Sequence, residues 1–308
     1  MWINLYLPLV ASGVFALAAP WTGQRLPPRI AAWLLTSAAL VAVCAWLAVL
    51  GMLGFTLVGQ IPQVAAEGRW SARMLAADAP VDRPVAAACS LVLLACAVAL
   101  TVSAWRQTRV LLSAWRECRG LPAAGDLVVI DDPAPTAFAL PGVPGRVVIS
   151  SGMLRALSVD ERRALLAHER AHLRHRHHIF LFLLQLSAAG NPLLRPVARA
   201  GAFALERWAD EQAGAEVADR QLIARAVARA ALAARRSPTT MLAATGGPVP
   251  QRVTALLSPP APLRRALLVG FGALMVVCCA SLGVAAQGMD QLFDAATPST
   301  ALIDVCDH

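Results

Sequence analysis

Charged residues are scarce in this 308-residue chain, and lysine is absent from it. Only 15% of the residues are charged whereas 57% are apolar, and all 27 basic residues are arginine. This composition excludes an ordinary soluble globular domain, in which about a quarter of the residues are charged. The seven cysteines form no CxxC pair, which excludes a cysteine-based zinc or redox motif.

Aromatic residues are also few, at 6% of the chain. The arginines at 220, 225, 229, 235 and 236 could bind nucleic acid, but no set of aromatic residues is interleaved with them and no DNA-binding motif is present. We therefore predict no direct nucleic acid binding. An excess of arginine on the cytoplasmic side of a membrane explains the series more simply.

Long uncharged apolar runs are abundant instead, and each can span the roughly 30 Å of a bilayer core. They predict an α-helical integral membrane protein with about four transmembrane helices. The first run could alternatively be a signal peptide, because Ala16-Leu17-Ala18 resembles a cleavage site, although no basic residue precedes it. The four runs are Trp2–Pro20, Ile30–Val58, Pro84–Ala104 and Ala266–Ala286.

These runs divide the chain into four parts. Residues 1–104 form a membrane region with helices at about 2–20, 30–58 and 84–104. Residues 105–263 form an extramembrane domain, which is followed by a fourth transmembrane helix at 264–286 and a tail at 287–308.

The distribution of arginine predicts the orientation of the chain in the membrane. Segment 105–263 holds 20 arginines against 12 acidic residues, whereas the tail after 286 has four aspartates and no basic residue. Because positive loops stay in the cytoplasm, we expect the 105–263 domain inside and the N-terminus, the 59–83 loop and the tail outside.

The strongest chemical signal is an HExxH motif, which comprises His168, Glu169 and His172. On a helix, residues i and i+4 share one face, so both imidazoles can reach one Zn²⁺ while Glu169 points at a water beside it. Ser158 and Glu161 form a capping box that opens the helix, which we predict to run to about His178.

A third zinc ligand is needed, and it must be sought beyond the motif. No histidine lies downstream at the spacing of a three-histidine site, so a carboxylate is considered. Glu206 and Asp210 lie at i and i+4 of a second predicted helix, where Glu206 can bind zinc and Asp210 can accept the N–H of a ligand histidine. Glu206 alone would suggest a solvated carboxylate, but beside HExxH we predict a gluzincin site with one Zn²⁺ per chain.

At this point the chain resembles the BlaR/MecR-type membrane metallopeptidases, which are relatives of the HtpX-type proteases. The resemblance implies an α+β zincin-like (gluzincin) domain inserted between membrane helices. It also implies that His168, His172 and Glu206 bind zinc and that Glu169 is the general base. The motifs that carry it are HERAH at 168–172, NPLL at 191–194, ExxAD at 206–210, AFALPG at 137–142 leading into VVIS at 147–150, and RVTALL at 252–257.

The same resemblance implies how a substrate binds and what it is. The strand upstream of the motif would hold an extended peptide by strand addition. Its residues are Arg146, Val147, Val148, Ile149, Ser150 and Ser151. The expected location is a bacterial plasma membrane, and the expected substrate is a cytosolic transcriptional repressor of the BlaI/MecI kind. Only about twenty residues follow the last predicted span, so we expect no penicillin-binding sensor domain there.

A rival hypothesis is a non-proteolytic membrane signalling or scaffold protein with a structural zinc. A lost Glu169 or a lost third ligand would favour it, and neither is lost. The intact set of residues therefore favours a zinc endopeptidase that acts in signal transduction.

Three local features complete the prediction. The apolar run at 179–190 is short for a span, and crossing would separate Glu206 from His168, so we expect it to be re-entrant, interfacial or buried. His175, His177 and His178 could form a second metal site, but a basic helix end facing anionic lipid headgroups is favoured. Strands are expected at Asp126–Ile130, Ala137–Leu140 and Arg146–Ser150, and a helix broken once over Gly201–Ala234.

Overall fold

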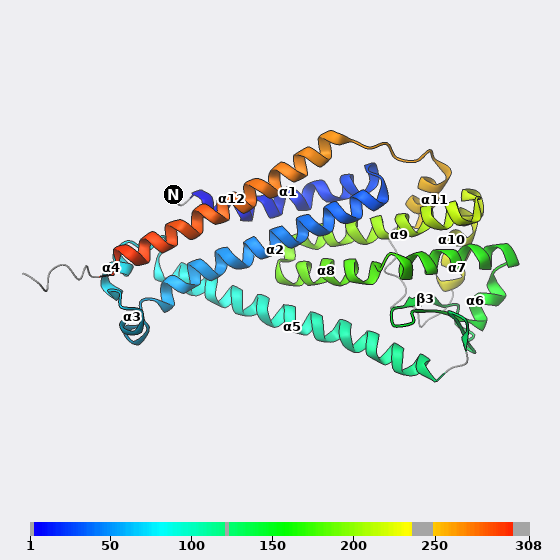
Figure 1. Cartoon of the computed structure of the whole chain (residues 1–308), viewed down its shortest axis with the longest axis horizontal. Coiled ribbons are helices and arrows are strands. Elements are labelled where there is room, and N and C mark those ends of the chain that lie inside the picture. The colour runs from blue at the N-terminus through cyan, green and yellow to red at the C-terminus, as the bar shows by residue number, and fades with distance from the viewer. Residues whose placement is uncertain (1–2, 121–122, 236–248, 298–308) are drawn as a thin grey trace, which may run out of the picture.

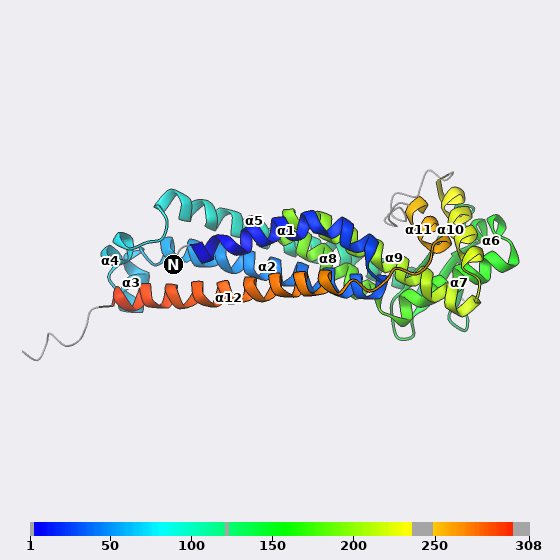
Figure 2. The same cartoon turned by 90° about the horizontal axis from the view of Figure 1, so that it is seen from above.

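Four long helices form one end of the molecule. The computed structural model describes residues 3–120, 123–235 and 249–297. The long helices are α1 (Ile3–Arg25), α2 (Pro28–Val58), α5 (Arg83–Arg119) and α12 (Arg265–Ala295). Figures 1 and 2 show α1, α2 and α12 running side by side, with a smaller domain at the opposite end of an elongated molecule.

These four helices are, by length and composition, the described helices that can cross a bilayer. They overlap the four predicted runs, which supports a membrane protein. Large apolar side chains point outward from α5, among them Leu91, Leu94 and Val98. Such an exposed apolar surface needs a covering of lipid or protein.

Two of these helices extend well past the predicted spans. Helix α5 continues beyond 104 to Arg119 because no glycine or proline interrupts it before Gly120, so the predicted domain boundary lies inside a helix. Helix α12 continues past 286 to Ala295, and the last part of the predicted tail, 298–308, lies outside the described residues. Two short helices, α3 (Pro62–Gly68) and α4 (Ala72–Ala77), cover the end of α12 through Leu75 and Trp70.

The small domain contains a four-stranded sheet. Its strands are β1 (Ala123–Ala124), β2 (Leu127–Ile130), β3 (Ala137–Leu140) and β4 (Arg146–Ser150), in the order β1-β2-β4-β3. Strand β4 runs parallel to β2 and antiparallel to β3. The three predicted strands are therefore confirmed, and β3 is an edge strand whereas β4 is internal.

Helix α7 carries the HExxH motif and begins at the predicted capping box. After the short α6 (Ser151–Ala156), α7 runs over Val159–Arg174, with Ser158 and Glu161 bonded to each other's backbone. The prediction that it continues to His178 is wrong. Arg176 adopts a left-handed backbone (φ 52°) that ends α7, and α8 (His177–Gly190) begins at the next residue. The break lets the apolar run join the long helices while α7 stays on the sheet.

The apolar run forms one arm of a helical hairpin inserted among the long helices. Helix α8 packs against α2, α5 and α9 (Arg195–Val217), and the 3₁₀ turn η1 (Pro192–Leu194) joins the two arms. At the tip, Asn191 donates a hydrogen bond of 3.1 Å to Ser12, which lies near the middle of α1. The run therefore turns back near the middle of α1 and does not continue along the full length of the bundle.

Two further helices close the domain around the motif helix. Helix α9 ends at Val217, and α10 (Arg220–Arg235) follows, which confirms a single break in the predicted helical segment. Helix α11 (Val249–Leu257) packs on α9 and α10. A core of small and branched side chains joins α7, α9, α10 and α11, and it includes Ala164, Ala167, Ala213, Ile223 and Leu256.

The hairpin geometry predicts that both of its ends emerge on one side of the membrane. In a background without native cysteines, Arg174→Cys and Ala215→Cys should react with a membrane-impermeant maleimide from the same side. Leu193→Cys, at the apolar tip, should stay unlabelled in intact membranes and react after detergent is added. Labelling of positions 174 and 215 from opposite sides would contradict the hairpin.

Candidate metal centre

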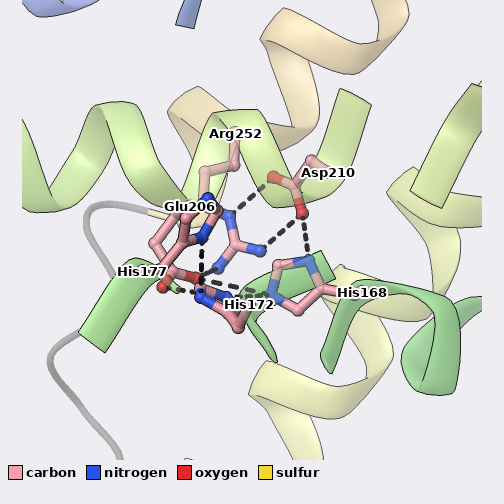
Figure 3. A network of polar contacts seen from close by, with 6 residues as sticks. All are labelled: His168, His172, His177, Glu206, Asp210 and Arg252. Atoms are coloured by element: carbon pink, nitrogen blue, oxygen red, sulfur yellow. Dashed lines mark hydrogen bonds and ion pairs between the residues drawn. The ribbon is translucent and has the colours of Figure 1, made fainter. Parts of the chain in front are cut away.

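Three side chains from two helices converge in a group that could hold a metal ion. Helix α7 brings His168 and His172 to one face, and α9 places Glu206 opposite them (Figure 3). The two Nε2 atoms lie 3.1 Å apart, and the Glu206 carboxylate oxygens lie 3.7 Å from His168 Nε2 and 3.6 Å from His172 Nε2. Among the described residues, these three side chains are the ones whose His, Cys, Asp or Glu donor atoms lie close enough together to hold one metal ion.

The separation of these donor atoms fits zinc. Zn–N and Zn–O bonds of about 2.0–2.1 Å in a tetrahedron place neighbouring donors about 3.3 Å apart. The three observed separations bracket that value without any rearrangement. Three protein ligands also leave a fourth tetrahedral position open, as in catalytic zinc sites and unlike structural ones.

A buried ion-pair network supports the ligands from behind. His168 Nδ1 lies 3.0 Å from Asp210 Oδ1, and Arg252 of α11 donates to both Asp210 oxygens at 2.8 and 2.6 Å. Arg252 also contacts Glu206 Oε2 at 2.8 Å. The guanidinium of Arg252 therefore holds the carboxylates of both Glu206 and Asp210. Its planar set of N–H donors can bind both oxygens of one carboxylate and an oxygen of the other at the same time.

Electrostatics makes the two histidines unequal. Burial disfavours a charged His168, but Asp210 and Glu206 outweigh it and raise its pKa to about 10. For His172 burial dominates and lowers the pKa to about 4. Burial also opposes ionisation of Glu206, yet Arg252 and the histidines hold its pKa below the ordinary range. The metal-free site therefore holds a proton on His168.

Glu169 lies beside this cluster and is shielded from water. It is 9% exposed, and its burial raises the pKa of the carboxyl group above the ordinary value. The backbone N–H of Ala139 in β3 donates to it. A divalent ion together with Arg252 would balance three carboxylates, the buried Glu169 and Asp210 and the partly buried Glu206, with both histidines neutral. The donor set thus matches zinc in charge as well as in geometry.

The structure brings five of the predicted site residues together. His168, Glu169, His172, Glu206 and Asp210 form one cluster. The predicted substrate-binding residues 146–151 need correction, because β4 is hydrogen-bonded to β2 on one side and β3 on the other. A peptide strand has no free edge there.

The free edge near the motif belongs to β3. Ser150 donates to the carbonyl of Thr136, so the backbone of Thr136 faces β4. Because backbone groups alternate along a strand, those of Ala137 and Ala139 face away from β4. The bond from Ala139 to Glu169 shows that this outward edge lies at the metal site.

Two residues of the site were missed by the sequence analysis. Arg252 lies 42 residues after Asp210, and only the RVTALL motif pointed to it. His177 was considered part of a basic helix end, but it is fully buried, its Nδ1 lies 3.0 Å from His172 Nδ1, and burial lowers its pKa to about 3. His175 contacts Gln212 and stacks on Trp208, so the described residues show no second metal group at this helix end.

Comparison with known proteins supports a metallopeptidase domain. A sequence model described as Peptidase family M48 matches residues 103–189, which is 87 of the 308 residues. The match includes His168, Glu169 and His172 and ends before Glu206 and Arg252. No curated protein and no solved structure matched the chain. The narrower resemblance to BlaR/MecR-type proteins stays a prediction.

The proton on His168 predicts a steep pH dependence of zinc affinity. Asp210 and Glu206 raise the pKa of His168 to about 10, whereas Arg252 opposes that shift, and His172 is already neutral above pH 5. Zinc must displace the His168 proton, so affinity should rise about tenfold per pH unit from pH 6.5 to 8.5. Competition with a chelator at each pH measures this slope. A slope that flattens above pH 7.5 would indicate an ordinary histidine instead.

Removing the guanidinium should destabilise the metal-free protein strongly. Arg252→Met leaves the buried Asp210 and the partly buried Glu206 without their partner, and loss of one partner of a buried ion pair typically costs about 3–5 kcal/mol. Arg174→Met is the matched control, because Arg174 pairs with Glu216 on the surface and should contribute less than about 1 kcal/mol. Denaturant titration in detergent micelles measures both. Equal effects of the two substitutions would show that Arg252 does not stabilise the site.

Proposed function

We propose that this protein is a membrane-embedded zinc endopeptidase. The observation that carries the proposal is the convergence of His168, His172 and Glu206 with one open position, beside a buried Glu169. The family match over 103–189 supports the same class. The long apolar helices support embedding in a membrane.

The residues of the site have separate roles in peptide hydrolysis. When bound, zinc would polarise the scissile carbonyl and lower the pKa of a water molecule. Glu169 accepts a proton from that water and later delivers it to the leaving amine, a task that suits a carboxylate whose pKa burial has raised. Asp210 and Arg252 hold His168 and Glu206 in position. Three donors of Arg252 are committed to these carboxylates, so its role is orientation.

The substrate backbone is best accommodated at β3. An extended peptide added to that edge would pair with the outward groups of Ala137 and with the carbonyl of Ala139, and it would pass directly in front of Glu169. Strand addition supplies backbone hydrogen bonds with little dependence on substrate sequence. This placement replaces the one expected at residues 146–151.

Regulated proteolysis on the cytoplasmic side is the biological role that we propose. The arginine excess of 105–263 supports a cytoplasmic peptidase domain. The resemblance to BlaR/MecR-type proteins favours a cytosolic transcriptional repressor as the substrate. The rival role is a scaffold with structural zinc. A structural zinc site has four protein ligands, whereas the group found among the described residues offers three, which disfavours this role.

Glu169→Gln tests the enzymatic role. The substitution keeps the size of the side chain and leaves the three ligands intact, so the purified protein should retain zinc. Hydrolysis of a peptide or protein substrate should fall by about 10²–10⁴-fold, because the general base is removed. Metal content and cleavage rate are measured on the same preparation.

Glu216→Gln is the matched control, because Glu216 is an exposed carboxylate that contacts Arg174 outside the site. Its rate should equal that of the unmodified protein. If the Glu169→Gln variant still cleaves the substrate, Glu169 is not the general base. Comparing the proteomes of cells that carry either variant would identify the substrate, and a repressor fragment missing only with Glu169→Gln would support the proposed role.

A further inference from the structure

His177 contacts the metal site although it lies outside the HExxH motif. It is the first residue of α8, directly after the left-handed Arg176, and its side chain is fully buried. Its Nδ1 lies 3.0 Å from His172 Nδ1, whereas Glu206 lies near Nε2 of the same ring, so His172 contacts His177 and Glu206 through different nitrogens. The helix break is what permits this contact.

The roles of the two nitrogens of His172 assign the direction of this hydrogen bond. His172 Nε2 faces His168 Nε2 and Glu206, so it must offer its lone pair to a metal. The proton of the neutral ring then resides on Nδ1 and is donated to His177 Nδ1. His177 accepts with Nδ1 and carries its own proton on Nε2.

The surroundings of His177 hold its ring in one orientation. Trp208 packs against it with ring centroids 4.7 Å apart, and the His175 ring stacks at 5.9 Å. Its Nε2 is buried and has no hydrogen-bond partner among the described residues. An apolar side chain would fill this place without an unsatisfied donor, so packing alone does not explain a histidine here.

We infer that His177 is a positioning residue for the metal, which orients His172 by accepting a hydrogen bond from its Nδ1–H. The site therefore supports its two histidine ligands differently: a carboxylate, Asp210, contacts His168, whereas a neutral imidazole contacts His172. Such outer contacts fix the ring and tautomer of a ligand histidine, and their loss typically lowers metal affinity about 10–100-fold. This inference rests on the proposed zinc site.

Two substitutions with the same branched side-chain shape, Asn and Leu, separate hydrogen bonding from packing. Asn places its side-chain oxygen where the Nδ1 of His177 lies, so His177→Asn keeps an acceptor, whereas His177→Leu removes it. Both lose the ring contacts with Trp208. Zinc affinity is measured on the full-length protein in detergent by competition with a chelator. We expect His177→Leu to bind zinc about 10–100-fold more weakly and His177→Asn to stay within about threefold of the unmodified protein.

A spectroscopic measurement adds a readout that does not depend on activity. The Co²⁺-loaded unmodified and His177→Asn proteins should give the same visible absorption, and His177→Leu should change it. His178→Leu, next in the chain and outside the hydrogen-bonded cluster, should leave both affinity and spectrum unchanged.

The outcomes distinguish this inference from the proposed function. If the unmodified protein binds no zinc, the proposed function fails. If it binds zinc and the Leu and Asn variants bind equally, the positioning role of His177 is overturned. Should His177→Leu fail to fold, a folded His177→Asn that has lost more than tenfold in affinity overturns the role by itself.

Discussion

The arrangement of the site depends on one buried guanidinium. Arg252 is 7% exposed and satisfies Asp210 and Glu206 at the same time. Without it, α9 would carry two carboxylates into a low-dielectric interior next to Glu169, where their repulsion and desolvation would favour protonation. With it, both carboxylates stay charged and hold fixed positions, one toward the metal position and one toward His168. The chemistry of α7 therefore depends on a residue from α11.

Helix α9 connects this site to the long helices. Glu206 and Asp210 face α7, whereas the neighbouring Arg207 points the other way and donates to the carbonyls of Gly23 and Gln24 at the end of α1. These carbonyls are among those that a helix C-terminus leaves unsatisfied, and a buried arginine is well suited to bind them. The same helix thus anchors both Glu206 and the end of a long apolar helix, which sets the candidate metal site close to the base of the bundle.

The hairpin of α8 and α9 explains how a short apolar segment fits this architecture. Fourteen residues of α8 are too few to cross a bilayer, and the polar side chain of Asn191 at the turn needs a buried partner, which Ser12 provides. By turning back, the chain keeps Glu206 on the side of His168 and His172. The left-handed Arg176 separates α7 from α8, and His177 directly after it lies against His172.

Most of the site's chemistry could be predicted from local patterns. His168, Glu169 and His172 lie within one helical turn, and Glu206 and Asp210 lie at i and i+4 of another helix, so helical periodicity alone aligns each set. The capping box at Ser158 predicted the start of α7 for the same reason. The end of α7, by contrast, depended on how α8 packs in the bundle, and no capping signal marks Arg176.

The sequence by itself determined the apolar runs, the strands, the HExxH motif and the pair of carboxylates at 206 and 210, because each follows from spacing along a few residues. Only the tertiary structure decided that β3 rather than β4 has the free edge, since strand order depends on pairings between distant segments. It also decided that Arg252 and His177 belong to the site. Their contacts arise from the packing of α11 on α9 and from a helix break, and neither leaves a periodic pattern in the chain.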